Sequence, residues 1–190
     1  MEIAIFVIIG IIVVLVLYGI SIYNGLVALK HGVSKAWANI DVLLKQRHDE
    51  LPKLVETCKQ YMEYEQETLE KVIEARAGVS KAREAGDIAA LGIAEGALRK
   101  GLGGLFALAE AYPDLKADGS FQQLQSRISS LEDSIADRRE FYNEAVNNNN
   151  VRIEQFPDVL IAGRFGFRAA ELLEFDEAET EDVDIKSLFD

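Results

Sequence analysis

The pattern of apolar and polar positions begins with one long apolar stretch. From Ile3 to Leu29 no residue carries a charge, and between Ile3 and Ile22 only Gly, Tyr and Ser depart from aliphatic or Phe character. A helix of about twenty residues spans about 30 Å, the thickness of the hydrocarbon core of a bilayer. Because a segment in lipid must satisfy its own backbone hydrogen bonds, the pattern predicts a membrane-spanning helix that contacts the lipid bilayer through residues 3–22.

A cleaved signal peptide is the alternative reading of this stretch. It requires a basic segment, an apolar run of about 7–15 residues and a small-residue cleavage site. Here only Met1 and Glu2 precede the run, the run is longer, and no Ala-x-Ala pattern follows it. We therefore expect a retained transmembrane anchor over residues 1–23.

The charges that flank the anchor predict its orientation. No Lys or Arg precedes the apolar run, whereas Lys30 and Lys35 follow it. The positive-inside rule places the side with more Lys and Arg in the cytoplasm. We expect a single-pass protein with its N-terminus outside and its C-terminal domain cytoplasmic.

Three amphipathic stripes follow the anchor, each with apolar positions three or four residues apart. This spacing places them on one face of a helix that seeks a partner. The positions are Val33, Trp37, Ile40, Leu44, Arg47, Leu51, Leu54, Cys58 and Tyr61; Leu91, Ala94, Leu98, Gly101, Leu105, Leu108 and Tyr112; and Phe121, Leu124, Ile128, Leu131, Ile135, Arg138, Tyr142 and Ala145. They predict an all-α fold, in which the transmembrane helix continues into a long antiparallel bundle of three long helices, with or without a short fourth.

Turn-forming residues separate the three predicted helices. Residues 85–87 break the first from the second, and residues 112–119 separate the second from the third, which Ser120 is expected to cap. The third helix is expected to end before Pro157. No strand is predicted except a weak one over Val183–Phe189.

Proline and glycine inside the predicted helices mark special positions. Pro52 removes the hydrogen bond to the carbonyl of His48 and is expected to kink the first helix. The second helix contains several glycines, each of which costs up to about 1 kcal/mol relative to Ala. Either close backbone packing or simple tolerance explains them. They are Gly92, Gly96, Gly101, Gly103 and Gly104.

Charge divides the rest of the chain into a domain and a tail. The 190 residues carry a formal net charge of −12, of which the nine acidic residues and one Lys of positions 171–190 account for −8. We assign residues 24–168 to the helical bundle and residues 169–190 to an acidic tail. A basic footprint for nucleic acid is absent. The one cysteine, Cys58, excludes an internal disulfide and is best explained as a small buried apolar residue.

Candidate chemistry is sparse, and the sequence predicts neither an enzyme nor a cofactor. A di-iron bundle needs Glu-x-x-His pairs, but the residues three before His31 and His48 are Ala28 and Lys45. No phosphate-binding loop follows a strand. We therefore expect no catalytic, cofactor-binding or metal-ligating residue.

Two arginines lie on apolar stripes, where an unpaired guanidinium is costly. Arg47 and Arg138 either form buried ion pairs that fix helix register, with Glu110 or Glu132 as partners, or pack their stems and extend their charged heads to solvent. Asn147–Asn150 is a second unusual feature, because four poor helix formers follow one another inside a predicted helix. The run is a weak point, a hydrogen-bonding surface or a frayed end.

The fixed positions along the chain, taken together, resemble the LemA family over about residues 18–168. The positions that carry the resemblance in the first half are Tyr23, Asn24, Leu26, Val27, Ala36, Trp37, Ile40, Asp41, Val42, Leu44, Lys45, Arg47, Asp49, Leu51, Pro52, Leu54, Val55, Tyr61, Glu65, Ala75 and Arg76. Those in the second half are Glu110, Tyr112, Pro113, Asp114, Leu115, Lys116, Ala117, Phe121, Leu124, Glu132, Ile135, Arg138, Tyr142, Asn143, Val146, Asn150, Ile153, Phe156, Pro157, Phe165, Gly166 and Phe167. The family usually repeats a Tyr-Asn pair where this chain has Asn149-Asn150.

The resemblance implies a bacterial protein of the inner membrane, with one span and a cytoplasmic helical domain, and no enzyme activity. Relatives include a magnetosome-associated protein, which points to membrane organisation. Our leading hypothesis is a non-enzymatic scaffold that self-associates as a homo-oligomer; the alternative is an adaptor that presents its bundle or acidic tail to a cytoplasmic partner protein. The candidates for structural or interaction roles are Trp37, Arg47, Pro52, Arg138, Tyr142 and Asn143.

Overall fold

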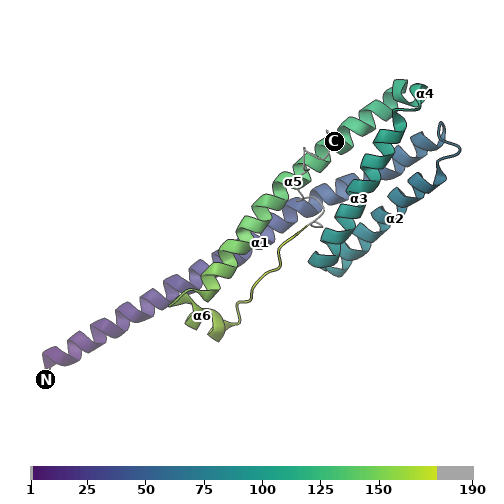
Figure 1. Ribbon diagram of the computed structural model, residues 1–190. Coiled ribbons are helices and arrows are strands. Elements are labelled where there is room, and N and C mark those ends of the chain that lie inside the picture. Colours follow the sequence, from purple (N-terminus) through teal and green to yellow (C-terminus); the bar gives the residue numbers. More distant parts are fainter. Residues whose placement is uncertain (1, 175–190) are drawn as a thin grey trace, which may run out of the picture. The chain divides into compact units, whose positions relative to one another are not determined.

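The computed structural model describes residues 2–174 and places most of them in six helices (Figure 1). The helices are α1 (Glu2–Lys59), α2 (Gln66–Ala85), α3 (Ile88–Ala109), α4 (Pro113–Ala117), α5 (Gly119–Glu154) and α6 (Asp158–Phe165). Residues 2–174 contain no strand, and the predicted all-α fold is confirmed. The weak strand predicted at Val183–Phe189, and the acidic tail beyond Glu174, lie outside the described residues.

Helix α1 is continuous over 58 residues and includes Pro52. It therefore carries both the apolar stretch and the first amphipathic stripe, as predicted. The large apolar side chains from Ile3 to Ile20 are each half exposed or more. Among the described helices, α1 alone is long and apolar enough to cross a membrane. Further along, the stripe is buried, with Ile40, Leu44 and Leu54 at most 2% exposed.

The first soluble helix is shorter than predicted, because the chain turns between Lys59 and Gln66. The carbonyl of Cys58 accepts hydrogen bonds from the backbone N–H groups of both Tyr61 and Met62, at 3.0 and 2.9 Å, which closes the helix. Contacts distant in sequence hold the turn: the Tyr61 hydroxyl bonds Asp118 at 3.1 Å, and that of Tyr112 bonds Glu65 at 3.3 Å. The fold consequently has four long helices instead of three.

The described chain divides into two compact units. The first comprises residues 2–42 and 135–172, and the second comprises residues 43–134 with residues 173 and 174. Helices α1 and α5 each contribute to both units, α2, α3 and α4 belong to the second, and α6 belongs to the first.

In the second unit, α2 and α3 form a helical hairpin (Figure 1). Gly86 ends α2 in the left-handed conformation, at φ 68°, which an L side chain would strain. The Asp87 side chain then caps α3 by accepting a hydrogen bond from the N–H of Ala90 at 2.8 Å. The predicted break at residues 85–87 is confirmed.

Helix α5 begins with a different cap from the one predicted. Asp118, not Ser120, accepts the hydrogen bond from the N–H of Phe121, at 2.9 Å. Asp118 also accepts from Tyr61, so one carboxylate serves both the helix start and the turn after α1. The end of α5 at Glu154 agrees with the predicted stop before Pro157.

The glycines of α3 have two explanations, depending on their position. A Cβ on Gly92 would lie 1.9 Å from the carbonyl oxygen of Glu174, so only glycine permits this approach. At Gly101 a Cβ would meet Val72 at an ordinary 3.5 Å. Gly103 and Gly104 face open space, so simple tolerance describes them.

Candidate functional sites

The most buried charge in the second unit is Arg47, which joins three helices. Its Nη2 donates to Glu95 Oε1 on α3 at 2.5 Å, and its Nη1 donates to Glu132 Oε1 on α5 at 2.6 Å. Arg47 is 1% exposed and Glu95 3%, whereas Glu132 is 16% exposed and lies 3.7 Å from Arg99 Nε. The buried ion pair with Glu132 is one of the two predicted alternatives. Glu110, the other suggested partner, instead pairs with Lys116.

Burial and charge oppose one another in this network. Burial favours a neutral Arg47, but Glu95 and Glu132 outweigh it and raise the pKa of the guanidinium above its ordinary value. For Glu95, burial raises the carboxyl pKa although Arg47 acts in the opposite direction. The charges of Arg47, Glu95 and Glu132 are therefore paired within this network. Sequence reasoning missed Glu95, although its spacing of four from Leu91 and three from Leu98 places it on the apolar stripe.

Pro52 acts through the carbonyl group that it leaves free. The His48 carbonyl, four residues earlier, cannot bond a proline nitrogen and instead accepts from Arg76 Nε at 3.0 Å. Arg76 Nη2 also donates to His48 Nε2 at 2.6 Å, which requires that ring nitrogen to be unprotonated. Burial, and then Arg76, lower the pKa of His48. Arg76 of α2 therefore supplies the hydrogen bond that the His48 carbonyl lacks because of Pro52.

In the first unit, the structure brings together two predicted site residues, Trp37 on α1 and Tyr142 on α5. Their rings pack edge to face with centroids 5.7 Å apart. The Tyr142 hydroxyl donates to the carbonyl of Glu171 at 2.9 Å. Asn143, the adjacent candidate, is half-buried. These side chains fix α1 against α5 within this unit.

Arg138 does not lie on the buried face where the sequence pattern placed it. It is exposed, and its guanidinium carbon sits 5.7 Å from the centroid of the Phe141 ring. The buried positions of α5 recur every seven residues, and half-buried positions lie three or four residues after each of them. After Ile135 the half-buried position is Arg139, four residues on, and Arg138 is left exposed. The buried residues at the seven-residue spacing are Phe121, Ile128, Ile135, Tyr142 and Asn149, with Val146 also buried between the last two.

The asparagine run is not frayed, because α5 continues through it to Glu154. Asn150 forms two hydrogen bonds with the backbone of Ala170. Its Nδ2 donates to the Ala170 carbonyl and its Oδ1 accepts from the Ala170 N–H, both at 2.9 Å. Asn149, which is 3% exposed, donates to the carbonyl of Arg168 at 3.3 Å. The predicted hydrogen-bonding surface is thus present, and it holds an extended segment after α6.

Helix α6 packs on α1 at the end of the apolar stretch (Figure 1). Ile22 and Leu26 are buried with Ala162, and Tyr23 lies edge-on to Phe165 and Phe167 at centroid distances of 4.9 and 5.7 Å. Arg152 of α5 pairs with the buried Asp158 at the start of α6. The helix is therefore held to both α1 and α5.

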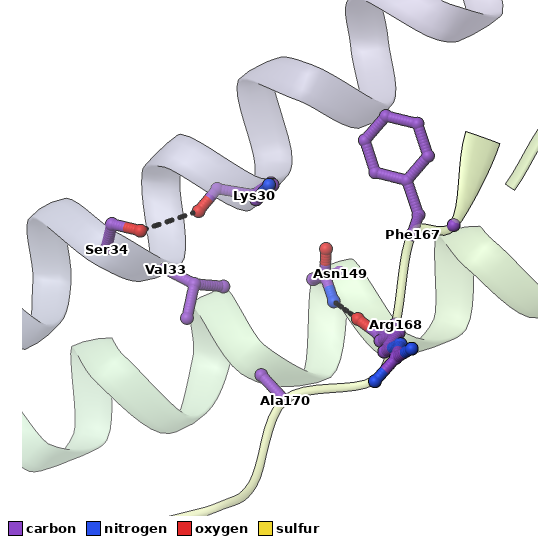
Figure 2. Close-up of a pocket in the computed structure, with 8 residues that line it drawn as sticks. Lys30, Val33, Ser34, Asn149, Phe167, Arg168 and Ala170 are labelled. Atoms are coloured by element: carbon purple, nitrogen blue, oxygen red, sulfur yellow. Dashed lines mark hydrogen bonds between the residues drawn. The ribbon is translucent and has the colours of Figure 1, made fainter. Parts of the chain in front are cut away.

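A pocket of about 300 Å³ lies beside this contact (Figure 2). Figure 2 shows Lys30, Val33 and Ser34 on α1, Asn149 on α5, and the extended segment from Phe167 to Ala170 closing the third side. Two cationic side chains, Lys30 and Arg168, line it together with one hydroxyl and one amide. This composition fits an anionic ligand.

The described residues hold no cluster of three or more His, Cys, Asp or Glu side chains that could bind a metal ion. Their most unusual charges serve packing instead, in the Arg47 network and in the His48–Arg76 pair. The fold and these sites define a helical-bundle protein with a candidate membrane-spanning helix. The chain belongs to the LemA family, whose model matches residues 36–186.

Over 78 residues the chain is 35% identical to magnetosome proteins MamQ 2 and MamQ 1 of Paramagnetospirillum magneticum. It is 31% identical to magnetosome protein MamQ of Magnetospirillum gryphiswaldense over the same length. Each match covers 41% of this chain and 29% of the relative. The matched region thus spans under a third of the length of these relatives. Neither the names of these relatives nor the family name is that of an enzyme.

Proposed function

We propose that this protein is a non-enzymatic, membrane-anchored scaffold that self-associates and organises the membrane or the proteins on it. The observation that carries the proposal is α1, in which one uninterrupted helix holds both the apolar stretch and the first stripe of the helical domain. Any lateral contact between domains would therefore act on the anchors. The similarity to magnetosome proteins supports an organising role.

The charges near α6 support a cytoplasmic position for the domain. Lys30 and Lys35 follow the apolar stretch in sequence, and the packing of α6 on Ile22 and Leu26 brings Arg164 into the same region. Positive charges near the end of a span favour the cytoplasmic side. We propose the inner membrane of a bacterium, with the N-terminus outside. Labelling of single introduced cysteines in intact cells by an impermeant maleimide measures this orientation.

Self-association is tested with the full chain in lipid vesicles. Single-molecule photobleaching of fluorescently tagged protein counts chains per spot as the ratio of protein to lipid rises. We expect multi-step bleaching well above the level set by random co-occupancy of vesicles. A single-span protein without a helical domain, at the same density, gives that random level. Single-step bleaching at every density contradicts the scaffold.

An adaptor that binds a cytoplasmic partner protein is the other outcome. The acidic tail is the candidate binding segment for such a partner. We would truncate the chain after Glu174, because residues 171–174 still contact Tyr142 and Gly92. A partner that is captured by the full chain, and lost after this truncation, would favour the adaptor if the chain is also monomeric. Full self-association by the truncated chain would favour the scaffold.

A further inference from the structure

Helix α6 lies alongside the last turns of the apolar stretch. A groove of about 340 Å³ lies between α1 and α6, and nearly all its surface is apolar. It is lined by Val16, Gly19, Ile20 and Tyr23 of α1 and by Ile161 and Phe165 of α6. If residues 3–22 cross the hydrocarbon core, this groove lies at the depth where the span leaves the bilayer. Part of α6 then sits at the membrane surface, not in water.

The outer side of α6, together with Phe156 just before it, is apolar and largely exposed. Phe156 is 80% exposed, Leu160 63% and Phe165 61%, although the Phe165 ring also packs edge-on against Tyr23. The half-exposed side chains of α1 form an apolar surface that is continuous with them through the groove. One lipid leaflet would cover both surfaces. Large aromatic and aliphatic side chains on a short amphipathic helix are typical of segments that lie in the membrane interface.

Positive charges lie where the headgroups of that leaflet would be. Lys30 is the first charged residue after the apolar stretch, and it lines the pocket in Figure 2 with Arg168. Neither side chain forms an ion pair with another described residue. Ser34 and Asn149 add polar groups to the same pocket. In a chain of net charge −12, two cations that form no ion pair within residues 2–174 match an anionic headgroup at this depth.

We propose that α6 and this pocket form a second lipid contact, in which Phe156, Leu160 and Phe165 enter the leaflet at which α1 leaves the bilayer. In the same contact, Lys30 and Arg168 bind the phosphate of an anionic phospholipid. This inference rests on the anchoring of α1 in a membrane and is independent of self-association.

Depth measurements in vesicles test the insertion of α6. Leu160→Cys, made with Cys58→Ala in the full chain, is labelled with a polarity-sensitive dye after reconstitution. We expect blue-shifted emission, quenching by lipids that carry a nitroxide near the headgroup end of the acyl chain, and protection from aqueous iodide. Water-like emission with full iodide quenching overturns the insertion of α6.

Two further labelled positions make that result specific. Phe141→Cys is the matched control, because Phe141 is a similarly exposed apolar residue of the same unit. It lies about three and a half turns before the end of α5, and we expect it to report water. Val13→Cys reports on the anchor. Lipid-like signals at position 13 with water-like signals at position 160 would overturn this inference alone, whereas water-like signals at position 13 would remove the anchor itself.

Anionic-lipid binding is tested by native mass spectrometry of the full chain in detergent with added phosphatidylglycerol or phosphatidylcholine. We expect preferential retention of phosphatidylglycerol, which weakens about fivefold for each of Lys30→Gln and Arg168→Gln. Lys35→Gln, an exposed lysine outside the pocket, should retain binding. Equal retention of the two lipids by the wild-type chain, or undiminished selectivity in the double variant, overturns the headgroup assignment. Inorganic phosphate that competes at equal concentration would indicate a soluble anion instead.

Discussion

Arg47 is a buried charge whose described partners are two carboxylates of the same helical bundle, so its role is structural. Its two carboxylate partners, Glu95 and Glu132, lie 48 and 85 residues away in sequence and on two other helices. A buried ion pair of this kind adds little net stability over apolar packing, but removal of one member leaves a buried charge. Its expected contribution is to the choice of helix register, since its guanidinium bonds one carboxylate of α3 and one of α5.

We expect Arg47→Met to lower the free energy of unfolding by about 3–5 kcal/mol, because Glu95 remains buried without its partner. The double variant Arg47→Met, Glu95→Met should recover much of this loss. Urea unfolding of the full chain in detergent, followed by circular dichroism, provides the measurement. Arg138→Met, at an exposed position, should change stability by less than about 0.5 kcal/mol. Equal effects of the two single variants would contradict the buried network.

His48 predicts a pH dependence of stability. Its pKa is lowered in the folded protein, first by burial and then by Arg76, so protonation favours the unfolded chain. The corresponding stability is present above the ordinary pKa of about 6.5 and is lost as the pH falls through the lower folded value. Asp49, Arg83 and Glu84 modify the same ring.

Between pH 7 and 5 we therefore expect the free energy of unfolding to fall more steeply for the wild-type chain than for His48→Gln. The excess slope is at most about 1.4 kcal/mol per pH unit. Denaturant titrations at several pH values measure it, and the difference between the two chains cancels the carboxylates that both share. Parallel curves would show that His48 is not the titrating group.

At the scale of elements, α3 depends on one close approach to the extended segment. Gly92→Ala would place a methyl group 1.9 Å from the Glu174 carbonyl and would displace Leu173, which is 1% exposed. We expect destabilisation by about 1–3 kcal/mol, despite the gain in helix propensity. Gly104→Ala, in open space on the same helix, should instead stabilise by up to about 1 kcal/mol. Thermal melts that rank the two variants in the opposite order would refute the close approach.

The asparagine run of α5 predicts a local effect on the segment after α6. Asn150→Ala removes both hydrogen bonds to Ala170, and we expect faster tryptic cleavage after Arg168 with a loss of about 1–3 kcal/mol. The exposed Asn148 makes no such contact in the described structure, so Asn148→Ala serves as the control. Limited proteolysis with mass spectrometry compares the cleavage rates. Equal rates in both variants would exclude the Asn150 contact.

At the scale of the whole molecule, helix periodicity was sufficient to predict the fold class. The stripe from Ile40 to Cys58 and the break at Gly86 follow from local sequence, because spacing and turn chemistry act within a few residues. The turn after Lys59 was missed, since no glycine or proline marks it and Asp118, far away in sequence, holds Tyr61. Glu95 was missed for the same reason: its role depends on an arginine from another helix.

The packing of α6 on α1 has a consequence for the type of membrane this protein suits. A single apolar helix normally adapts to bilayer thickness by tilting or sliding. If residues 3–22 span the bilayer, the packing of Ile22 and Leu26 against α6 would limit how far that end of the helix can slide into it. A thicker or thinner bilayer would then have to deform around the helix instead. Hydrophobic mismatch of this kind would sort the protein toward membrane regions whose thickness matches the stretch from Ile3 to Ile22.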